Sequence, residues 1–175
     1  MKAFRTLKKT GIVGLLVLAA ACSSDSDGGS GGTLPSGTYI KSNFDGSSWQ
    51  TFEVAGQSAT VAMSNGTGAE RTILINGTGN MSGTDSMVIN LMGIDAPGTY
   101  TIDADSGGVL AYVVTASSLS YDTSNCDGAS GTVVITAIND TKVEGTFSFT
   151  GKVDENCSDS KTFTEGSFRG VFSSN

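Results

Sequence analysis

The chain has 175 residues, with 10 Lys and Arg against 17 Asp and Glu for a formal net charge of −7, and it contains no histidine. The acidic balance, without a basic cluster in the body of the chain, excludes nucleic acid as a partner because a phosphate backbone would be repelled. The absence of histidine excludes the usual general base, the usual zinc ligand and every Ser-His or Cys-His catalytic pair.

The first 21 residues have the pattern of a cleaved signal peptide. Four basic residues stand within positions 2–9, and residues 11–21 are apolar and small. That apolar run is shorter than the roughly 20 residues that a transmembrane helix needs, so a permanent membrane span is the weaker alternative.

The leader ends in Leu18-Ala19-Ala20-Ala21-Cys22, which resembles the lipobox of bacterial lipoproteins, with its leucine one position further from the cysteine than usual. The resemblance implies cleavage before Cys22 and transfer of diacylglycerol to its thiol; an ordinary secretory signal cut nearby is the alternative. Without the four basic residues of the leader, six Lys and Arg face all 17 acidic residues, a net charge of −11. Attachment to a membrane must then come from the acyl chains, which contribute about 0.8 kcal/mol per buried methylene.

Residues 22–36 combine the cysteine with Ser, Asp and Gly, a composition that predicts a flexible tether. The stretch Ser23-Ser24-Asp25-Ser26-Asp27 resembles the acidic export signal of surface lipoproteins of Bacteroidota. The resemblance implies display on the outer face of the outer membrane, with a periplasm-facing anchor as the alternative.

Residues 37–175 are predicted to form a single β domain. Short runs of β-branched and aromatic residues alternate there with Gly, Ser, Asn and Asp turns, and no stretch has a helical period. We expect an all-β antiparallel sandwich of ten or eleven short strands, with a closed or flattened calycin-like barrel as the alternative. The predicted strands are 38–42, 49–54, 59–64, 71–76, 86–92, 98–103, 109–115, 118–122, 131–138, 142–151 and 161–172.

Alternation identifies the core face of the last strands. From Val143 to Thr150 apolar and polar residues alternate, so one face is buried and the other solvated. In the final predicted strand Phe163 and Phe168 have opposite parity. A bulge at Glu165-Gly166 would insert one residue and turn both rings inward.

Cys126 and Cys157 are an even pair in a compartment that permits oxidation. A hairpin about residues 139–142 would bring the two cysteines together, which predicts a disulfide; two reduced thiols are the alternative. Closing this loop would stabilise the fold by about 3–4 kcal/mol.

Several short segments recur in a fixed order that resembles a known family. They are Phe44–Trp49, Ala96–Ile102, Gly131–Thr136, Val143–Phe149 and Thr164–Phe168. Together they resemble the uncharacterised lipoprotein domains of Bacteroidota that share a "VDGxxW … PGTY … GTVTIT … GTFSF … TNGSF" pattern, from which Glu165 departs because asparagine is expected there. The resemblance implies a β fold on an exported lipoprotein and carries no activity with it.

The acidic residues suggest two kinds of chemistry, each with a plainer alternative. Glu53, Glu70, Glu144 and Glu165 could serve a glycan hydrolase that uses two carboxylates, but they are scattered and are expected to be solvated charges. A disulfide would also draw a set of acids toward one end of the domain, where calcium or only salt would screen them. That set is Asp122, Asp127, Asp154, Glu155 and Asp159, which matches no calcium-loop spacing.

Trp49 is the one tryptophan, either a core anchor or a platform for a sugar ring. Since no catalytic motif and no cofactor motif is found, we expect a non-enzymatic lipid-anchored module that binds a glycan or a protein, in an oligomeric state that the sequence leaves open. A structural or protective envelope component and a carboxylate-dependent glycan hydrolase are the alternatives.

Overall fold

The computed structural model describes residues 37–153 and 157–172. The leader, Cys22, the tether, Asp154 and Glu155 lie outside these residues, so the interpretations given for them stay predictions. The described part is almost entirely β, with two single-turn 3₁₀ helices, η1 (Gly68–Glu70) and η2 (Thr115–Ser117).

Each of the eleven predicted strands overlaps a strand of the structure, so the all-β antiparallel prediction is confirmed. The strands are β1 (Tyr39–Phe44), β2 (Ser47–Gln50), β3 (Glu53–Val54), β4 (Gln57–Ser58), β5 (Thr60–Asn65), β6 (Thr72–Thr78), β7 (Asp85–Met92), β8 (Gly98–Ile102), β9 (Val109–Val114), β10 (Leu119–Asp122), β11 (Ser130–Ile138), β12 (Lys142–Val153) and β13 (Ser160–Val171).

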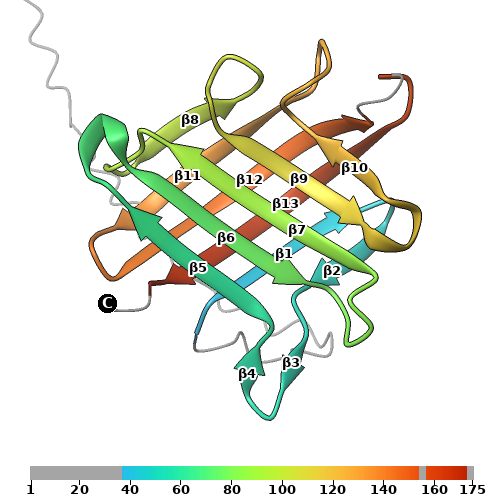
Figure 1. The fold of residues 1–175 in the computed structure, drawn as a ribbon, viewed down its shortest axis with the longest axis horizontal. Helices are drawn as coiled ribbons and strands as arrows, with labels where there is room; N and C mark the ends of the chain where they lie inside the picture. Colours follow the sequence, from blue (N-terminus) through green and yellow to red (C-terminus); the bar gives the residue numbers. More distant parts are fainter. Residues whose placement is uncertain (1–36, 154–156, 173–175) are drawn as a thin grey trace, which may run out of the picture. The chain divides into compact units, whose positions relative to one another are not determined.

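Eleven of these strands form one antiparallel sheet that curls into two layers, like half of a barrel (Figure 1). The rear layer of Figure 1 has the order β2-β1-β13-β12-β11-β8, and the front layer has the order β10-β9-β7-β6-β5. Strand β10 joins the layers because it pairs with β9 on one edge and with the end of β12 on the other. On the opposite side the layers touch, since a Cβ on Gly170 of β13 would lie 3.0 Å from the Cβ of Ala62 in β5.

The core fills the space between the two layers. Its largest fully buried side chains are Phe163, Phe168, Ile40, Ile73, Ile75, Met87, Ile89, Leu91, Leu110, Ile135, Val133 and Val143. Phe149 of β12 stacks on Phe163 of β13 with 4.4 Å between ring centroids. Each side chain of this size stabilises the fold by about 1.5–3 kcal/mol on burial.

The last strand contains the predicted bulge, displaced by one residue from Glu165-Gly166 to Thr164-Glu165. Between the pairs Phe147↔Gly166 and Phe149↔Phe163, one residue of β12 faces two residues of β13, Thr164 and Glu165. The extra residue restores the inward direction of the strand, so that both Phe163 and Phe168 are buried. Glu165 itself has a φ of 52°, in the left-handed region.

The predicted disulfide is confirmed as well. Cys126 and Cys157 are joined with 5.5 Å between their Cα atoms. The hairpin from β11 to β12 turns at Asn139, whose N–H donates to the carbonyl of Lys142 at 2.9 Å and whose side-chain oxygen accepts the N–H of Thr141 at 2.8 Å.

The prediction of one strand over 49–54 is wrong. Strand β2 ends at Gln50, and β3 instead pairs with β4 in a separate two-stranded sheet. The two residues between them, Ala55 and Gly56, have φ values of 51° and 77°. Two consecutive positive φ values make the type I′ turn that closes a tight hairpin, and alanine gives little sequence signal for it.

Candidate functional site

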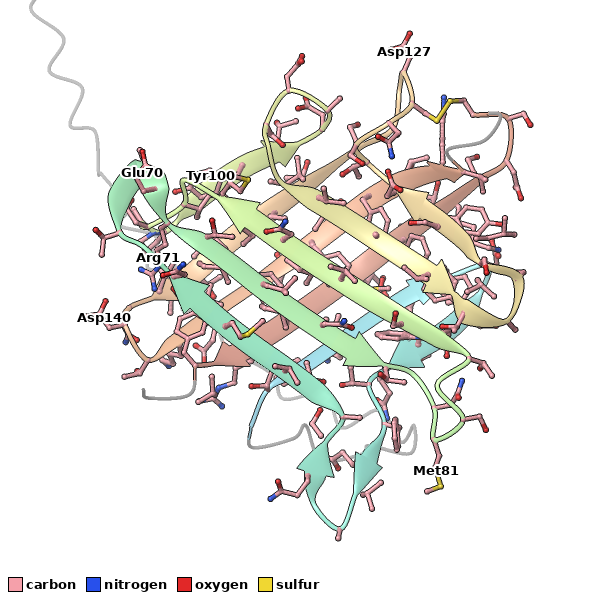
Figure 2. All side chains as sticks on the ribbon, in the orientation of Figure 1. Glu70, Arg71, Met81, Tyr100, Asp127 and Asp140 are labelled. Atoms are coloured by element: carbon pink, nitrogen blue, oxygen red, sulfur yellow. A yellow bond between two sulfur atoms is a disulfide. The ribbon has the colours of Figure 1, made fainter. Side chains whose placement is uncertain are left out.

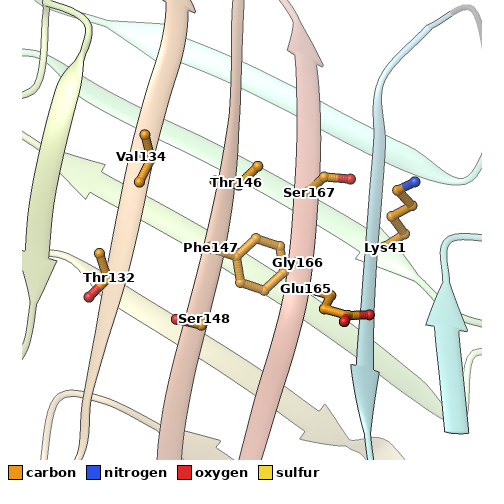
Figure 3. Close-up of a pocket in the computed structure, with 9 residues that line it drawn as sticks. All are labelled: Lys41, Thr132, Val134, Thr146, Phe147, Ser148, Glu165, Gly166 and Ser167. Carbon is orange, nitrogen blue, oxygen red and sulfur yellow. The ribbon is translucent and has the colours of Figure 1, made fainter. Parts of the chain in front are cut away.

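A shallow groove of about 400 Å³ crosses the outer face of the rear layer (Figure 3). It is formed by β11, β12, β13 and β1. The lining residues are Lys41, Thr132, Val134, Thr146, Phe147, Ser148, Glu165, Gly166 and Ser167.

Strand register explains why these side chains meet. One row of side chains crosses the four strands from β11 to β1, because each member is the direct cross-strand partner of the next. The row consists of Val134, Thr146, Ser167 and Lys41. Thr132 and Ser148 begin the next row, which runs into the bulge of β13. Because these are outward positions of the alternating pattern, the groove has a floor of hydroxyl groups on a rigid sheet.

Glu165 is the carboxylate of this groove, and the bulge places it there. Its Oε2 accepts a hydrogen bond from Nδ2 of Asn43 at 2.6 Å, which holds the carboxylate between β13 and β1. From the inner side the buried hydroxyl of Ser42 donates to the carbonyl of Thr164 at 3.1 Å. The bulge is therefore supported on both faces, and a non-glycine residue with positive φ is retained at its tip.

Ser167 adds an unsatisfied polar group beside the bulge. Its Oγ is buried and finds no hydrogen-bond partner within the described residues. A hydroxyl can both donate and accept, so this group is available to a polar ligand that enters the groove. The groove thus combines one carboxylate, one ammonium group from Lys41 and several hydroxyls.

This arrangement suits polar binding better than hydrolysis. Glycoside hydrolysis needs a second carboxylate about 5–9.5 Å from the first. Of the other candidates, Glu53 lies in β3 and Glu70 lies at η1 (Figure 2). Glu144 shares the outer face of the rear layer, but Lys142 and Arg169 neutralise it at 3.2 and 3.0 Å. Among the described residues that line the groove, Glu165 has no carboxylate partner.

The calcium candidates do not gather into a metal site in the described part of the chain. Asp122 is buried and accepts hydrogen bonds from Ser120 and Ser124, whereas Asp159 accepts the hydroxyl of Tyr121 at 2.9 Å. Asp127 lies at the tip of a loop near the disulfide (Figure 2). Residues 37–153 and 157–172 contain no group of three His, Cys, Asp or Glu that could hold a metal ion.

Trp49 is a core residue. Its side chain is 6% exposed, packs edge-on against Tyr112 and donates from Nε1 to Oδ2 of Asp85 at 2.6 Å. The ring therefore offers no free face for a sugar, and the anchor interpretation is the one that the structure supports. The carboxylate partner was not expected from the sequence, although Asp85 shares its parity with the buried Met87 and Ile89, which was the available signal.

One end of the space between the layers is closed by an ion pair. Nζ of Lys161 lies 2.8 Å from Oδ2 of Asp45 and 5.5 and 5.3 Å from the ring centroids of Phe44 and Tyr121. The hydrogen bond to Asp45 raises the pKa of Lys161, so the side chain is held as a cation at this position. The ammonium group of Lys161 and the rings of Phe44 and Tyr121 therefore lie together at one end of the domain.

The fold and the groove define a curled antiparallel β domain with a polar site on one outer face. The chain belongs to the family described as a Domain of unknown function (DUF6252), whose model matches residues 37–171. The expectation of an uncharacterised domain family is confirmed at this level. No curated protein and no solved structure matches the chain. Within the residues described, no helix has the length and apolar character to cross a membrane.

Proposed function

We propose that the protein is a lipid-anchored envelope protein, of the type found in Bacteroidota, whose β domain binds a glycan without catalysing its cleavage. The observation that carries the proposal is the fixed carboxylate of Glu165, held by Asn43 beside a row of hydroxyls and Lys41. Structural support for the groove comes from four strands, so its polar groups are ordered before a ligand arrives.

The chemistry of the groove favours a carbohydrate among polar ligands. A carboxylate accepts hydrogen bonds from adjacent sugar hydroxyls, and Ser and Thr hydroxyls both donate to and accept from them. The groove is shallow, which suits an extended chain that enters from the side. Phe147 lines it but is only 4% exposed, so hydrogen bonds rather than ring stacking supply the affinity.

The proposed location rests on the amino-terminal sequence. The leader, the lipobox-like ending at Cys22 and the Ser- and Asp-rich tether support delivery to the outer membrane and display at the cell surface. Such a position would give the domain access to glycans outside the cell. The net charge of −11 beyond the leader favours neutral or basic glycans over strongly anionic ones.

A glycan array probed with the domain from Gly37 onward tests this function, in calcium and in EDTA. We expect binding to a restricted set of neutral glycans in both conditions, and Glu165→Gln to weaken it at least tenfold. Glu53→Gln is the matched control, because it makes the same change at an exposed carboxylate in β3, outside the groove. Binding to no glycan, or equal binding by both variants, would overturn the proposal.

A further inference from the structure

On the outer face of the front layer, the four neighbouring strands β5, β6, β7 and β9 direct no charged side chain outward. The charged residue of this layer at an outward position is Asp122 of β10, which is buried beside Ala111 at the edge of the face. The outward residues of β5, β6, β7 and β9 are Val61, Met63, Asn65, Thr72, Leu74, Asn76, Thr78, Ser86, Val88, Asn90, Met92, Val109, Ala111 and Val113. Asp85, the charged residue of these four strands, points inward to Trp49 and Tyr112.

The register arranges the central side chains in two rows that are apolar except for one asparagine in each. Met63, Leu74, Asn90 and Val109 are cross-strand partners in one row, and Val61, Asn76, Val88 and Ala111 form the next. Three of the apolar side chains are well exposed, with Val61 at 61%, Met63 at 55% and Met92 at 49%. A hollow of about 250 Å³ lies between the side chains of β5 and β6 on this face.

A contiguous apolar face of this kind marks an interaction surface. The net charge of the chain bears on which partner could cover this face. The chain beyond its leader carries a net charge of −11, so two copies repel one another wherever their charged surfaces meet. The outward side of β5, β6, β7 and β9 is where contact between two copies desolvates no charged side chain of these strands on either copy. It also offers nothing that would attract a basic partner or an ionic headgroup.

We propose that two copies of the protein pack through the outer faces of their front layers, about a two-fold axis. Two identical twisted sheets can pack face to face at about 10 Å, as the layers of a β-sandwich do. The Asn76 and Asn90 amides carry a donor and an acceptor each, so they can pair with the same groups of a second copy. The grooves of the two rear layers then face outward on opposite sides.

The size of the face indicates a weak dimer. From the spacing and rise of strands, four strands and the eight residues of β7 span about 19 by 26 Å, roughly 500 Å² per copy. The total of about 1,000 Å² is at the lower limit of specific interfaces. Anchoring to one membrane raises the effective concentration of the copies, so the dimer is expected in the envelope rather than in dilute solution.

Cysteine cross-linking of the full chain in the envelope of a Gram-negative host tests the dimer. Leu74→Cys, Val88→Cys and Asn90→Cys sample the centre of the face. Thr99→Cys is the matched control, because Thr99 is exposed on the outer face of the rear layer and does not line the groove. After oxidation with copper phenanthroline, we expect a disulfide-linked dimer for at least one front-face variant on a non-reducing gel. The parent chain and the Thr99→Cys variant give none.

A charge placed in the face supplies a second readout. The second substitution is made in the variant that cross-links. Val88→Lys is combined with a cysteine at position 74 or 90, and Leu74→Lys with a cysteine at position 88. Each should lower the dimer yield at least fivefold. Thr101→Lys, on the outer face of the rear layer and outside the groove, should leave it unchanged. Protection of the Cys126–Cys157 disulfide from reductant in each variant verifies that the domain is folded.

Three results would overturn the proposal, and each identifies another state of the face. Front-face cysteines that react freely with an aqueous maleimide and form no dimer would show an open surface. Cross-links to other proteins in place of the dimer would show a different protein partner. Cysteines shielded from maleimide without any cross-link would place the face against the bilayer. None of these results depends on glycan binding, so this test fails or succeeds separately from the proposed function.

Discussion

Asp85 is the polar centre of the core. Its carboxylate accepts hydrogen bonds from Nε1 of Trp49 at 2.6 Å, from the hydroxyl of Tyr112 at 3.1 Å and from Nδ2 of Asn80 at 2.6 Å. Burial, followed by the negative charge of Asp85, raises the pKa of Tyr112 above its ordinary value, so the phenol remains a hydrogen-bond donor at any physiological pH. One carboxylate thus satisfies the polar atoms of two large core side chains.

Replacing this carboxylate should destabilise the domain strongly. Asp85→Ala leaves the buried indole N–H and phenol O–H without an acceptor, and we expect the free energy of unfolding to fall by about 3 kcal/mol. Asp85→Asn keeps one acceptor oxygen and should lose less. Urea unfolding followed by the fluorescence of Trp49, the one tryptophan of the chain, measures both. Equal midpoints for Asp85→Ala and the parent would contradict the role given to this residue.

At the scale of the element, the bulge in β13 links stability to function. Glu165 has a φ of 52°, a conformation that is about 1–2 kcal/mol unfavourable for a residue with a side chain. Glu165→Gly should therefore raise the free energy of unfolding by about 0.5–1 kcal/mol, after the greater flexibility of glycine in the unfolded chain is counted. The same variant loses the carboxylate of the groove, so its glycan binding should fall. A less stable Glu165→Gly protein in urea unfolding would show that the bulge is not strained.

Gly166, the next residue of the bulge region, should respond to substitution with the opposite change in the free energy of unfolding. A Cβ on Gly166 would lie 2.5 Å from the carbonyl oxygen of Phe147 and 2.7 Å from its ring. Gly166→Ala should thus lower the free energy of unfolding by about 2 kcal/mol, since neither the strand nor the buried ring can move away. Opposite signs at two adjacent positions would be difficult to explain without the bulge.

At the scale of the whole domain, the disulfide ties two connections together. Cys126 lies between β10 and β11, and Cys157 lies between β12 and β13, 31 residues further along the chain. This is also the end of the domain where β10 bridges the front and rear layers by pairing with β12. The cross-link therefore restrains the unfolded chain and supports the junction of the two layers.

Removing the cross-link should lower stability without changing the fold. We expect the double substitution Cys126→Ser with Cys157→Ser to lower the free energy of unfolding by about 3–4 kcal/mol, the entropy of a loop of this length. Circular dichroism should still show a β protein, and a reducing agent should shift the parent to the midpoint of the double variant. A shift of the double variant itself by the reductant would show that the effect does not come from this disulfide.

The local alternation of side chains accounts for how much of this domain could be predicted. Short β-branched runs between turn residues, with the period-two pattern along β12, were enough for the all-β class. The parity conflict of Phe163 and Phe168 indicated the bulge, and the even cysteine pair indicated the disulfide. The turn at Ala55-Gly56 was missed because an alanine in the sequence does not indicate a positive φ. The groove was missed, although Glu165 was named, because its rows join residues up to about 130 positions apart.

The sequence by itself determined the all-β class, the approximate positions of most strands and the buried face of β12, because these depend on near neighbours in the chain. Only the tertiary structure decided which strands lie side by side, and with them the rows that make a hydroxyl-lined groove on one layer and an uncharged apolar face on the other. Strand order and register are properties of long-range pairing, and an outward threonine or valine looks the same in the sequence wherever its strand is placed.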